Sequence, residues 1–86
     1  MNIALLKLKA YVEISSYRVK VIKAIGNDYK IPTKIAQDCG IRTNHISKVL
    51  KELKDKNIIE CINEEARKGR LYRLTPMGIQ IYNEVK

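Results

Sequence analysis

The sequence predicts a mainly α-helical domain with one small β-hairpin, which is an α+β fold class. Two observations lead to this prediction. Near the middle of the chain, a short amphipathic segment, residues 35–39, is followed by Gly40 and then by a second amphipathic segment, which is the spacing of a helix-turn-helix. Further along, two β-rich runs, residues 58–62 and 71–74, flank a polar stretch, as in a hairpin.

Residues 3–14 carry two periodicities, and the pattern alone does not choose between them. Apolar and charged residues alternate as in a strand, while a second set of apolar residues recurs at helical spacing. The helical set is Ile3, Leu6, Ala10 and Ile14. The content of Leu, Ala, Lys and Glu favours a helix. We expect residues 1–14 to form a helical N-terminal segment that can serve in dimerisation, and residues 15–86 to form the folded domain.

A helix is predicted next, over residues 17–25. Ser15 and Ser16 precede it and offer side-chain oxygens that can cap its N-terminus. Gly26 and the polar residues after it end the helix. The side chains that this helix is expected to bury are Tyr17, Val21, Ile22 and Ile25.

The helix-turn-helix begins at Pro32, which suits the first position of a helix because proline has no backbone N–H to leave unpaired. This helix is short and closes at Cys39. Gly40 stands where the chain must adopt the left-handed conformation that glycine adopts without a side-chain penalty. Ala36 lets the two helices cross closely. The apolar wedge between them consists of Ile35, Cys39, Ile41, Ile46 and Val49.

The second helix of the motif is predicted over residues 43–56. Apolar residues at i, i+3, i+4 and i+7 share one of its faces. They are Ile46, Val49, Leu50 and Leu53. The opposite face presents Asn44, His45, Ser47, Lys48 and Lys51. Part of the charge is expected to support the helix itself through i,i+4 ion pairs. These pairs are Lys48 with Glu52, Lys51 with Asp55, and Glu52 with Lys56.

Asn57 ends this helix, and the predicted hairpin follows. Its tip, residues 63–70, is long, polar and basic. The cations of the tip are Arg67, Lys68 and Arg70, which surround Gly69. Thr75 and Pro76 are suited to be the cap and the first residue of a last helix. The apolar residues of this helix are Ile79, Tyr82 and Val85 on one face, with Ile81 beside them.

Length and net charge limit the number of domains and the kinds of partner that the chain can have. The 86 residues allow one small domain, and 17 Lys and Arg against 9 Asp and Glu give a formal net charge of +8. Such an excess repels itself in a compact state, and an anionic partner, most commonly nucleic acid, accounts for it. A solvated lysine-rich surface is the alternative. Nine of the cations gather in and before the second motif helix and in the hairpin, which favours a partner. They are Arg42, Lys48, Lys51, Lys54, Lys56, Arg67, Lys68, Arg70 and Arg73.

Cysteine content and hydropathy indicate the cellular compartment in which the protein is expected. Cys39 and Cys61 are too few for a disulfide framework or a zinc ribbon, and we expect both to be small core residues. No apolar stretch is long enough to span a bilayer, and no signal-peptide pattern is present. A cytoplasmic protein is therefore expected.

The order of the predicted elements, helix, helix, turn, helix, hairpin and helix, is that of a winged helix-turn-helix domain. Residues 16–21, 35–53 and 68–75 together resemble archaeal winged-helix transcriptional regulators akin to the multiple-antibiotic-resistance (MarR) and arsenical-resistance (ArsR) repressor classes. The resemblance covers residues 15–80, and the hairpin run Gly-Arg-Leu-Tyr-Arg-Leu-Thr is its most specific part. It implies that the helix beginning near Thr43 enters the major groove of double-stranded DNA. The hairpin, or wing, would follow the DNA backbone or the minor groove.

Candidate DNA contacts follow from this placement. Asn44 can pair with adenine through two hydrogen bonds, and Lys48 with guanine or a phosphate. Arg42 stands where these families often carry a capping Ser, so either Thr43 caps the helix or Arg42 reaches a phosphate. His45, the only histidine, is expected to contact DNA or solvent rather than a metal. The predicted DNA-binding residues are Arg42, Thr43, Asn44, His45, Ser47, Lys48, Lys51, Arg67, Lys68 and Arg70.

Other functions fit the sequence less well. No phosphate-binding loop, activated nucleophile or carboxylate cluster indicates an enzyme, a metal or a cofactor. The main alternative is a winged-helix protein-interaction module of a transcription or replication complex, but such a module would expose apolar residues on the helix 43–56. RNA is a weaker candidate because its A-form major groove is too deep and narrow for a helix. No effector ligand is predicted.

A two-fold homodimer is expected because apolar residues exceed what a three-helix core with one hairpin can cover. The surplus comprises Leu5, Leu6, Leu8, Val12, Ile79, Ile81 and Tyr82. The core of residues 15–75 is expected to be self-contained. Residues 3–14 and the last helix would then join the two protomers.

Overall fold

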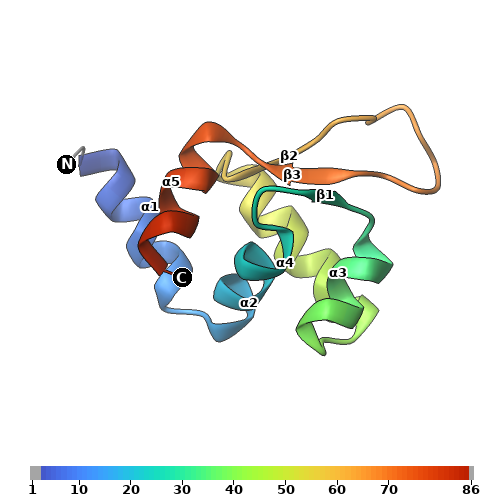
Figure 1. Ribbon diagram of the computed structural model, residues 1–86, viewed down its shortest axis with the longest axis horizontal. Coiled ribbons are helices and arrows are strands. Elements are labelled where there is room, and N and C mark those ends of the chain that lie inside the picture. Colours follow the sequence, from blue (N-terminus) through green and yellow to red (C-terminus); the bar gives the residue numbers. More distant parts are fainter. Residues whose placement is uncertain (1–2, 86) are drawn as a thin grey trace.

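The computed structural model describes residues 3–85, in which five helices surround a small antiparallel sheet (Figure 1). In chain order the elements are α1 (Ile3–Glu13), α2 (Ser16–Ile25), β1 (Tyr29–Lys30), α3 (Pro32–Cys39), α4 (Thr43–Asp55), β2 (Ile59–Cys61), β3 (Tyr72–Leu74) and α5 (Pro76–Val85). This is the winged helix-turn-helix predicted from the sequence, with α3 and α4 as the helix-turn-helix and the loop between β2 and β3 as the wing.

The sheet has three strands in the order β1-β3-β2, one more than predicted. The hairpin of β2 and β3 is confirmed, with Ile59 opposite Leu74. The strand that the sequence analysis missed is β1, whose Tyr29 lies opposite Arg73. A two-residue strand is too short to show an alternating pattern, and it forms only because the free edge of β3 offers it backbone partners.

Local signals place the helix ends where the sequence predicts them. The Ser15 hydroxyl oxygen accepts a hydrogen bond from the Arg18 backbone N–H at 3.3 Å and so caps α2. At the turn of the helix-turn-helix, Gly40 has a φ of 70°, and its N–H donates to the Ala36 carbonyl. Only glycine adopts this conformation without strain, so the sharp turn depends on that residue. The α4 helix ends at Asp55, and Asn57, two residues further on, has a positive φ of 60°.

The hydrophobic core draws on every helix and both hairpin strands. Its buried members include Leu5 and Val12 from α1 and Ile81 from α5, the last two with no exposed surface. The expectation that residues 15–75 form a self-contained core is therefore wrong. Ile81 is likewise not surplus, because α5 turns it inward and leaves Ile79, Tyr82 and Val85 only half-buried.

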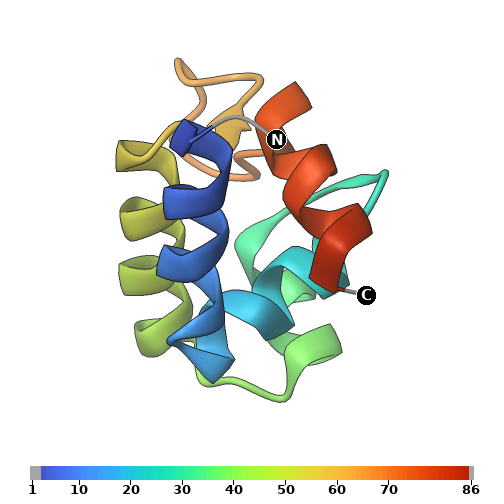
Figure 2. The ribbon, with the colours of Figure 1, turned by 90° about the vertical axis from the view of Figure 1, so that its left-hand side faces the viewer.

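The N-terminal segment is a helix, as the composition favours, and the residues that it buries are not those of the helical set named from the sequence. It packs against α2 and α5 through Leu5 and Val12, and Figure 2 shows α1 and α5 side by side at one end of the molecule. The predicted stripe faces solvent instead. Its exposed fractions are 71% for Ile3, 48% for Leu6 and 79% for Ile14, and Ala10 is exposed as well.

Three further expectations about burial need correction. Tyr17 is 40% exposed, although Val21, Ile22 and Ile25 of the same helix are buried. Cys39 and Cys61 are free thiols that are half-buried rather than core residues. The Cys39 thiol donates to the Lys20 carbonyl at 3.4 Å, and burial, with the nearby Asp38 charge, raises the pKa of this thiol above its ordinary value.

Residues 3–85 contain neither a membrane-spanning helix nor a cluster of metal ligands. No helix in this part of the chain has the length and apolar character needed to cross a membrane. Within the same residues, no group of three or more His, Cys, Asp and Glu side chains lies close enough together to hold a metal ion.

Candidate nucleic-acid interface

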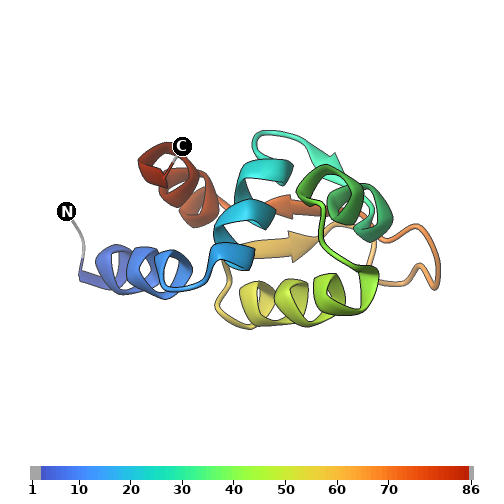
Figure 3. The same ribbon diagram turned by 90° about the horizontal axis from the view of Figure 1, so that it is seen from below.

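The outer face of α4 is polar because its apolar residues all point into the core. Ile46, Val49, Leu50 and Leu53 are buried, and the residues between them are exposed except for the half-buried Glu52. All ten predicted DNA-binding residues lie on the surface: Arg42, Thr43, Asn44, His45, Ser47, Lys48 and Lys51 around α4, and Arg67, Lys68 and Arg70 in the wing. Figure 3 shows α4 along one edge of the domain, with the wing at one end of this edge and α1 at the other.

The start of α4 decides between the two capping arrangements left open by the sequence. The helix begins at Thr43, which makes Arg42 the N-cap residue, and the Arg42 side chain forms no capping hydrogen bond. Thr43 is thus a helical residue and not the cap. Arg42 is exposed at the N-terminus of α4, where the backbone N–H groups of the first turn favour anions.

Among residues 3–85 none of the three predicted i,i+4 ion pairs of α4 is formed, and Glu52, which belongs to two of them, binds a residue of another helix. Its Oε1 lies 3.3 Å from Nε of Arg18 in α2. Among residues 3–85, Lys48 and Lys51 have no ion-pair partner. These two cations on the outer face of α4 are therefore available to an external anion.

Arg18 also ties α4 to the N-terminal helix. Its Nη1 donates to the Tyr11 carbonyl at 2.8 Å, and the guanidinium lies 3.8 Å from the centroid of the Tyr11 ring. Lys56 approaches the same ring at 5.3 Å. This cluster, which joins α1, α2 and α4, was not anticipated from the sequence, because Arg18 and Glu52 are 34 residues apart.

The wing is braced by its own side chains. Asn63 accepts a hydrogen bond from the Leu71 N–H at 2.7 Å and donates to the Gly69 carbonyl at 3.1 Å. Arg70 donates to the carbonyls of Ala66 and Glu64 at 2.8 and 3.0 Å. The guanidinium of Arg70 is thus committed to the loop, which leaves Arg67 and Lys68 as the outward cations of the tip. Asn63 was missed, although asparagine commonly bonds to nearby backbone in loops.

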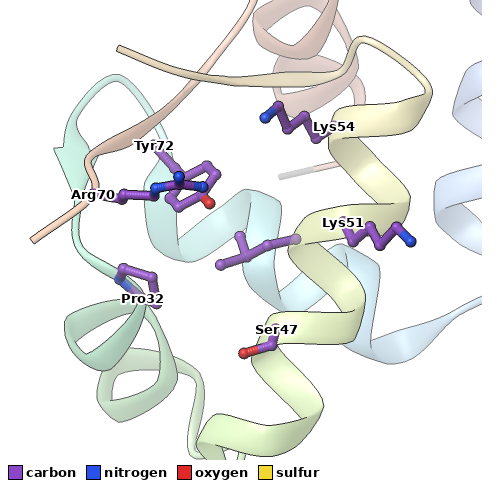
Figure 4. Close-up of a pocket in the computed structure, with 7 residues that line it drawn as sticks. Pro32, Ser47, Lys51, Lys54, Arg70 and Tyr72 are labelled. Carbon is purple, nitrogen blue, oxygen red and sulfur yellow. The ribbon is translucent and has the colours of Figure 1, made fainter. Parts of the chain in front are cut away.

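A groove of about 250 Å³ lies between the wing and α4. It is lined by Pro32, Ser47, Leu50, Lys51, Lys54, Arg70 and Tyr72 (Figure 4). Lys54 points toward the wing, where its Nζ binds Glu64, and this bond raises the pKa of Lys54 and lowers the pKa of Glu64. The groove makes the outer face of α4 and the wing one continuous surface with a cationic rim.

Two of the nine gathered cations are engaged away from this surface. Arg73 binds Glu60 of the neighbouring strand at 2.8 Å, and Lys56 lies near the Tyr11 ring. His45, by contrast, is exposed at the N-terminal end of α4, where its ring meets the ring of Tyr17 with centroids 5.7 Å apart. The polar surface thus extends to α2, which the sequence analysis did not predict.

Comparison with known proteins bears on the fold. No protein-family model and no curated protein sequence matches the chain. Among solved structures, a mutant of Lactococcus lactis ZitR is similar, with a TM-score of 0.71 and 20% identity over 81% of this chain and 49% of ZitR. The chain thus spans about half the length of that protein.

Two further structures align over most of this chain. The reduced form of MarR from E. coli has a TM-score of 0.75 and 20% identity, over 94% of this chain and 61% of MarR. The homodimeric winged helix-turn-helix DNA-binding domain of a possible ArsR-family transcriptional regulator from Mycobacterium bovis has a TM-score of 0.75 and 15% identity, over 94% of this chain and 74% of that domain. At these identities the likeness concerns the fold, and the chain has the winged helix-turn-helix fold seen in MarR-type and ArsR-type structures.

Proposed function

We propose that this chain is a sequence-specific, double-stranded-DNA-binding transcriptional regulator. In this proposal the helix of residues 43–56 lies in the major groove, and the wing, residues 63–70, follows the backbone or the minor groove. The observation that carries the proposal is the continuous surface formed by α4 and the wing, in which every side chain that the sequence predicts for DNA is exposed. The similar structures, which include a winged helix-turn-helix DNA-binding domain and MarR, support it.

The chemistry of α4 suits base reading and phosphate binding. The amide of Asn44 can donate an N–H to N7 of adenine while its oxygen accepts a hydrogen bond from the N6 amino group, a bidentate pair that no other base offers in the major groove. Lys48 and Lys51, which have no intramolecular ion pair, can bind guanine or phosphate oxygens. Arg42, Thr43 and the first-turn N–H groups are placed for a phosphate at the helix N-terminus.

The wing is suited to the DNA backbone. Arg67 and Lys68 are exposed at its tip, and a narrow minor groove concentrates negative potential that attracts such cations. Arg70, whose guanidinium holds the carbonyls of Ala66 and Glu64, keeps the tip in shape. A loop ordered before binding loses less conformational entropy when it binds.

The exposed face of α4 also separates this proposal from a protein-docking module. A docking surface needs a desolvated apolar centre. The residues that α4 exposes are all polar or charged, and its apolar residues are buried: the exposed set is Thr43, Asn44, His45, Ser47, Lys48, Lys51, Lys54 and Asp55. The groove beside α4 is rimmed by Lys51, Lys54 and Arg70, which suits an anionic partner better than an apolar anchor.

We further propose that two copies of the chain form a two-fold dimer through α1. Ile3, Leu6 and Ala10 of this helix, and Ile14 directly after it, are exposed apolar residues that we call the α1 stripe. A second copy would cover the stripe, and the similar Mycobacterium bovis domain, which is described as homodimeric, supports this choice of partner. A two-fold dimer would read a near-palindromic site whose half-sites lie about 34 Å apart, or a multiple of that.

A salt titration tests the proposed function. DNA affinity is measured by fluorescence anisotropy on a site selected from a random pool, and log affinity should fall by about 0.9 per phosphate neutralised for each unit of log salt. Lys48→Gln should reduce this slope, whereas the control Lys23→Gln, on α2, should leave it unchanged. An affinity that stays constant between low and moderate salt, or no enriched site, would refute DNA regulation, and an apolar protein partner would then become the better candidate.

A further inference from the structure

Tyr17 has an unusual environment for a large aromatic side chain of a core-forming helix. It is 40% exposed, while Val21, Ile22 and Ile25 of the same helix are buried. Its ring does not lie free on the surface. It makes an edge-type contact with the His45 ring, with centroids 5.7 Å apart and an angle of 68° between the planes.

The backbone that carries Tyr17 is held firmly against α4. Ser15 caps the first turn of α2, and the next residue after Tyr17, Arg18, bonds to Glu52 of α4 and to the Tyr11 carbonyl of α1. The Arg18 side chain is only 14% exposed, so these bonds are well shielded from water. The bond between Arg18 and Glu52 therefore holds α2 against α4 and keeps the rings of Tyr17 and His45 next to each other.

His45 is the side chain on which this contact acts. It occupies the third position of α4, in the turn that enters the major groove in the proposed function, and it is exposed. A free imidazole on a helix surface samples several rotamers, and fixing one of them on binding lowers affinity. A ring that is already held in perpendicular contact avoids part of that loss, since such aromatic pairs are favourable.

We infer that Tyr17 is a positioning residue for DNA recognition: its ring sets the direction of the His45 ring at the head of α4, so that α2 takes part in the base preference of the interface. The inference rests on the proposed function. Tyr17 itself does not contact DNA in this inference. Its aromatic ring, and not its hydroxyl, positions the His45 ring.

A double-mutant cycle tests this role. DNA affinity and the selected base preference are measured for Tyr17→Leu, Tyr17→Phe, His45→Ala and the double variant Tyr17→Leu with His45→Ala. Tyr29→Leu is the matched control, because Tyr29 is also an exposed tyrosine, at 58%, on strand β1. Thermal unfolding of each variant checks the fold.

If the Tyr17–His45 contact positions His45, substitutions of the two residues should have coupled effects on DNA affinity and base preference. Tyr17→Leu should weaken binding to the preferred site about 3- to 10-fold, and Tyr17→Phe, which keeps the ring, should stay within about 2-fold of the wild type. The double variant should bind no more weakly than His45→Ala alone, and both single losses should flatten the preference at the same base positions. Tyr29→Leu should change neither quantity.

Other outcomes would overturn the inference while leaving DNA binding intact. These are additive effects in the cycle, an unchanged base preference in Tyr17→Leu, or a loss in Tyr17→Phe as large as in Tyr17→Leu. If the leucine variant does not fold, nuclear Overhauser contacts between the two rings in the wild type decide, because the inference requires them to persist when DNA is added. If the wild-type protein binds no DNA, the proposed function itself is refuted.

Discussion

Lys54 of α4 and Glu64 of the wing form an ion pair with 2.5 Å between Nζ and Oε1. Both side chains are largely exposed, so the pair contributes little to the free energy of unfolding. Its importance is geometric. Together with the two bonds that Arg70 donates to loop carbonyls, it sets where the wing stands relative to the helix that we place in the major groove.

The pair makes the wing sensitive to acid. The hydrogen bond from Lys54 holds the pKa of Glu64 below its ordinary value of 4.5, so the pair is complete above that pH and is lost as the pH falls through the lowered pKa. The amide resonances of residues 63–70 should therefore titrate together with a midpoint below 4.5. Glu64→Gln should abolish this titration, and Glu65→Gln should preserve it. A wing that titrates identically in the Glu64→Gln variant would mean that the pair is not formed in solution.

Arg70 and Lys68 should affect DNA binding in different ways. Arg70→Lys keeps the charge but loses the fork that reaches two carbonyls, so affinity should fall about 5-fold with an unchanged salt slope. Lys68→Gln removes an exposed charge and should lower the slope by about 0.9. Anisotropy titrations at several salt concentrations measure both. If Arg70→Gln reduces the slope and Arg70→Lys binds like the wild type, Arg70 contacts a phosphate directly.

Gly78 should not tolerate a methyl group. It faces the Ile58 carbonyl oxygen from within α5, and a β-carbon there would overlap this atom. The oxygen cannot retreat freely, because it accepts hydrogen bonds from the backbone N–H and the hydroxyl of Thr75. Glycine to alanine normally stabilises a helix by about 1 kcal/mol, but Gly78→Ala should destabilise the protein by about 1 to 3 kcal/mol.

Chemical denaturation measures this change in the free energy of unfolding. Gln80→Ala, at an exposed position of the same helix, is the control and should be neutral or slightly stabilising. A Gly78→Ala variant at least as stable as the wild type would show that α5 can move away from Ile58.

The dimer is best tested by point substitution. Deleting residues 1–14 would also remove Leu5 and Val12 from the core, so loss of binding after that deletion would not be informative. Leu6→Glu places a charge in the exposed stripe and should give a monomer that binds a full palindromic site at least about 10-fold more weakly. Lys23→Glu, on α2, is the control for added negative charge. A wild type that sediments as a monomer at tens of micromolar would contradict the dimer.

The sequence by itself determined the features that arise within a few residues. The turn at Gly40, the Ser15 cap, the start at Pro32 and the hairpin all depend on local backbone chemistry, and the structure has them where they were predicted. The polar face of α4 could also be predicted from the sequence, because one clear apolar stripe at helical spacing leaves only the opposite face for solvent.

Tertiary structure decided everything that depends on distant partners. Helix α1 has apolar residues on two sides, and only its packing against α2 and α5 selects Leu5 and Val12 as the buried pair. The exposure of Tyr17, the clamp between Arg18 and Glu52 and the inward turn of Arg70 follow the same rule. The hydrophobic periodicity of a sequence shows which sides of a helix are apolar. It does not show which other element packs against each side, because that contact forms between segments that are far apart in the chain.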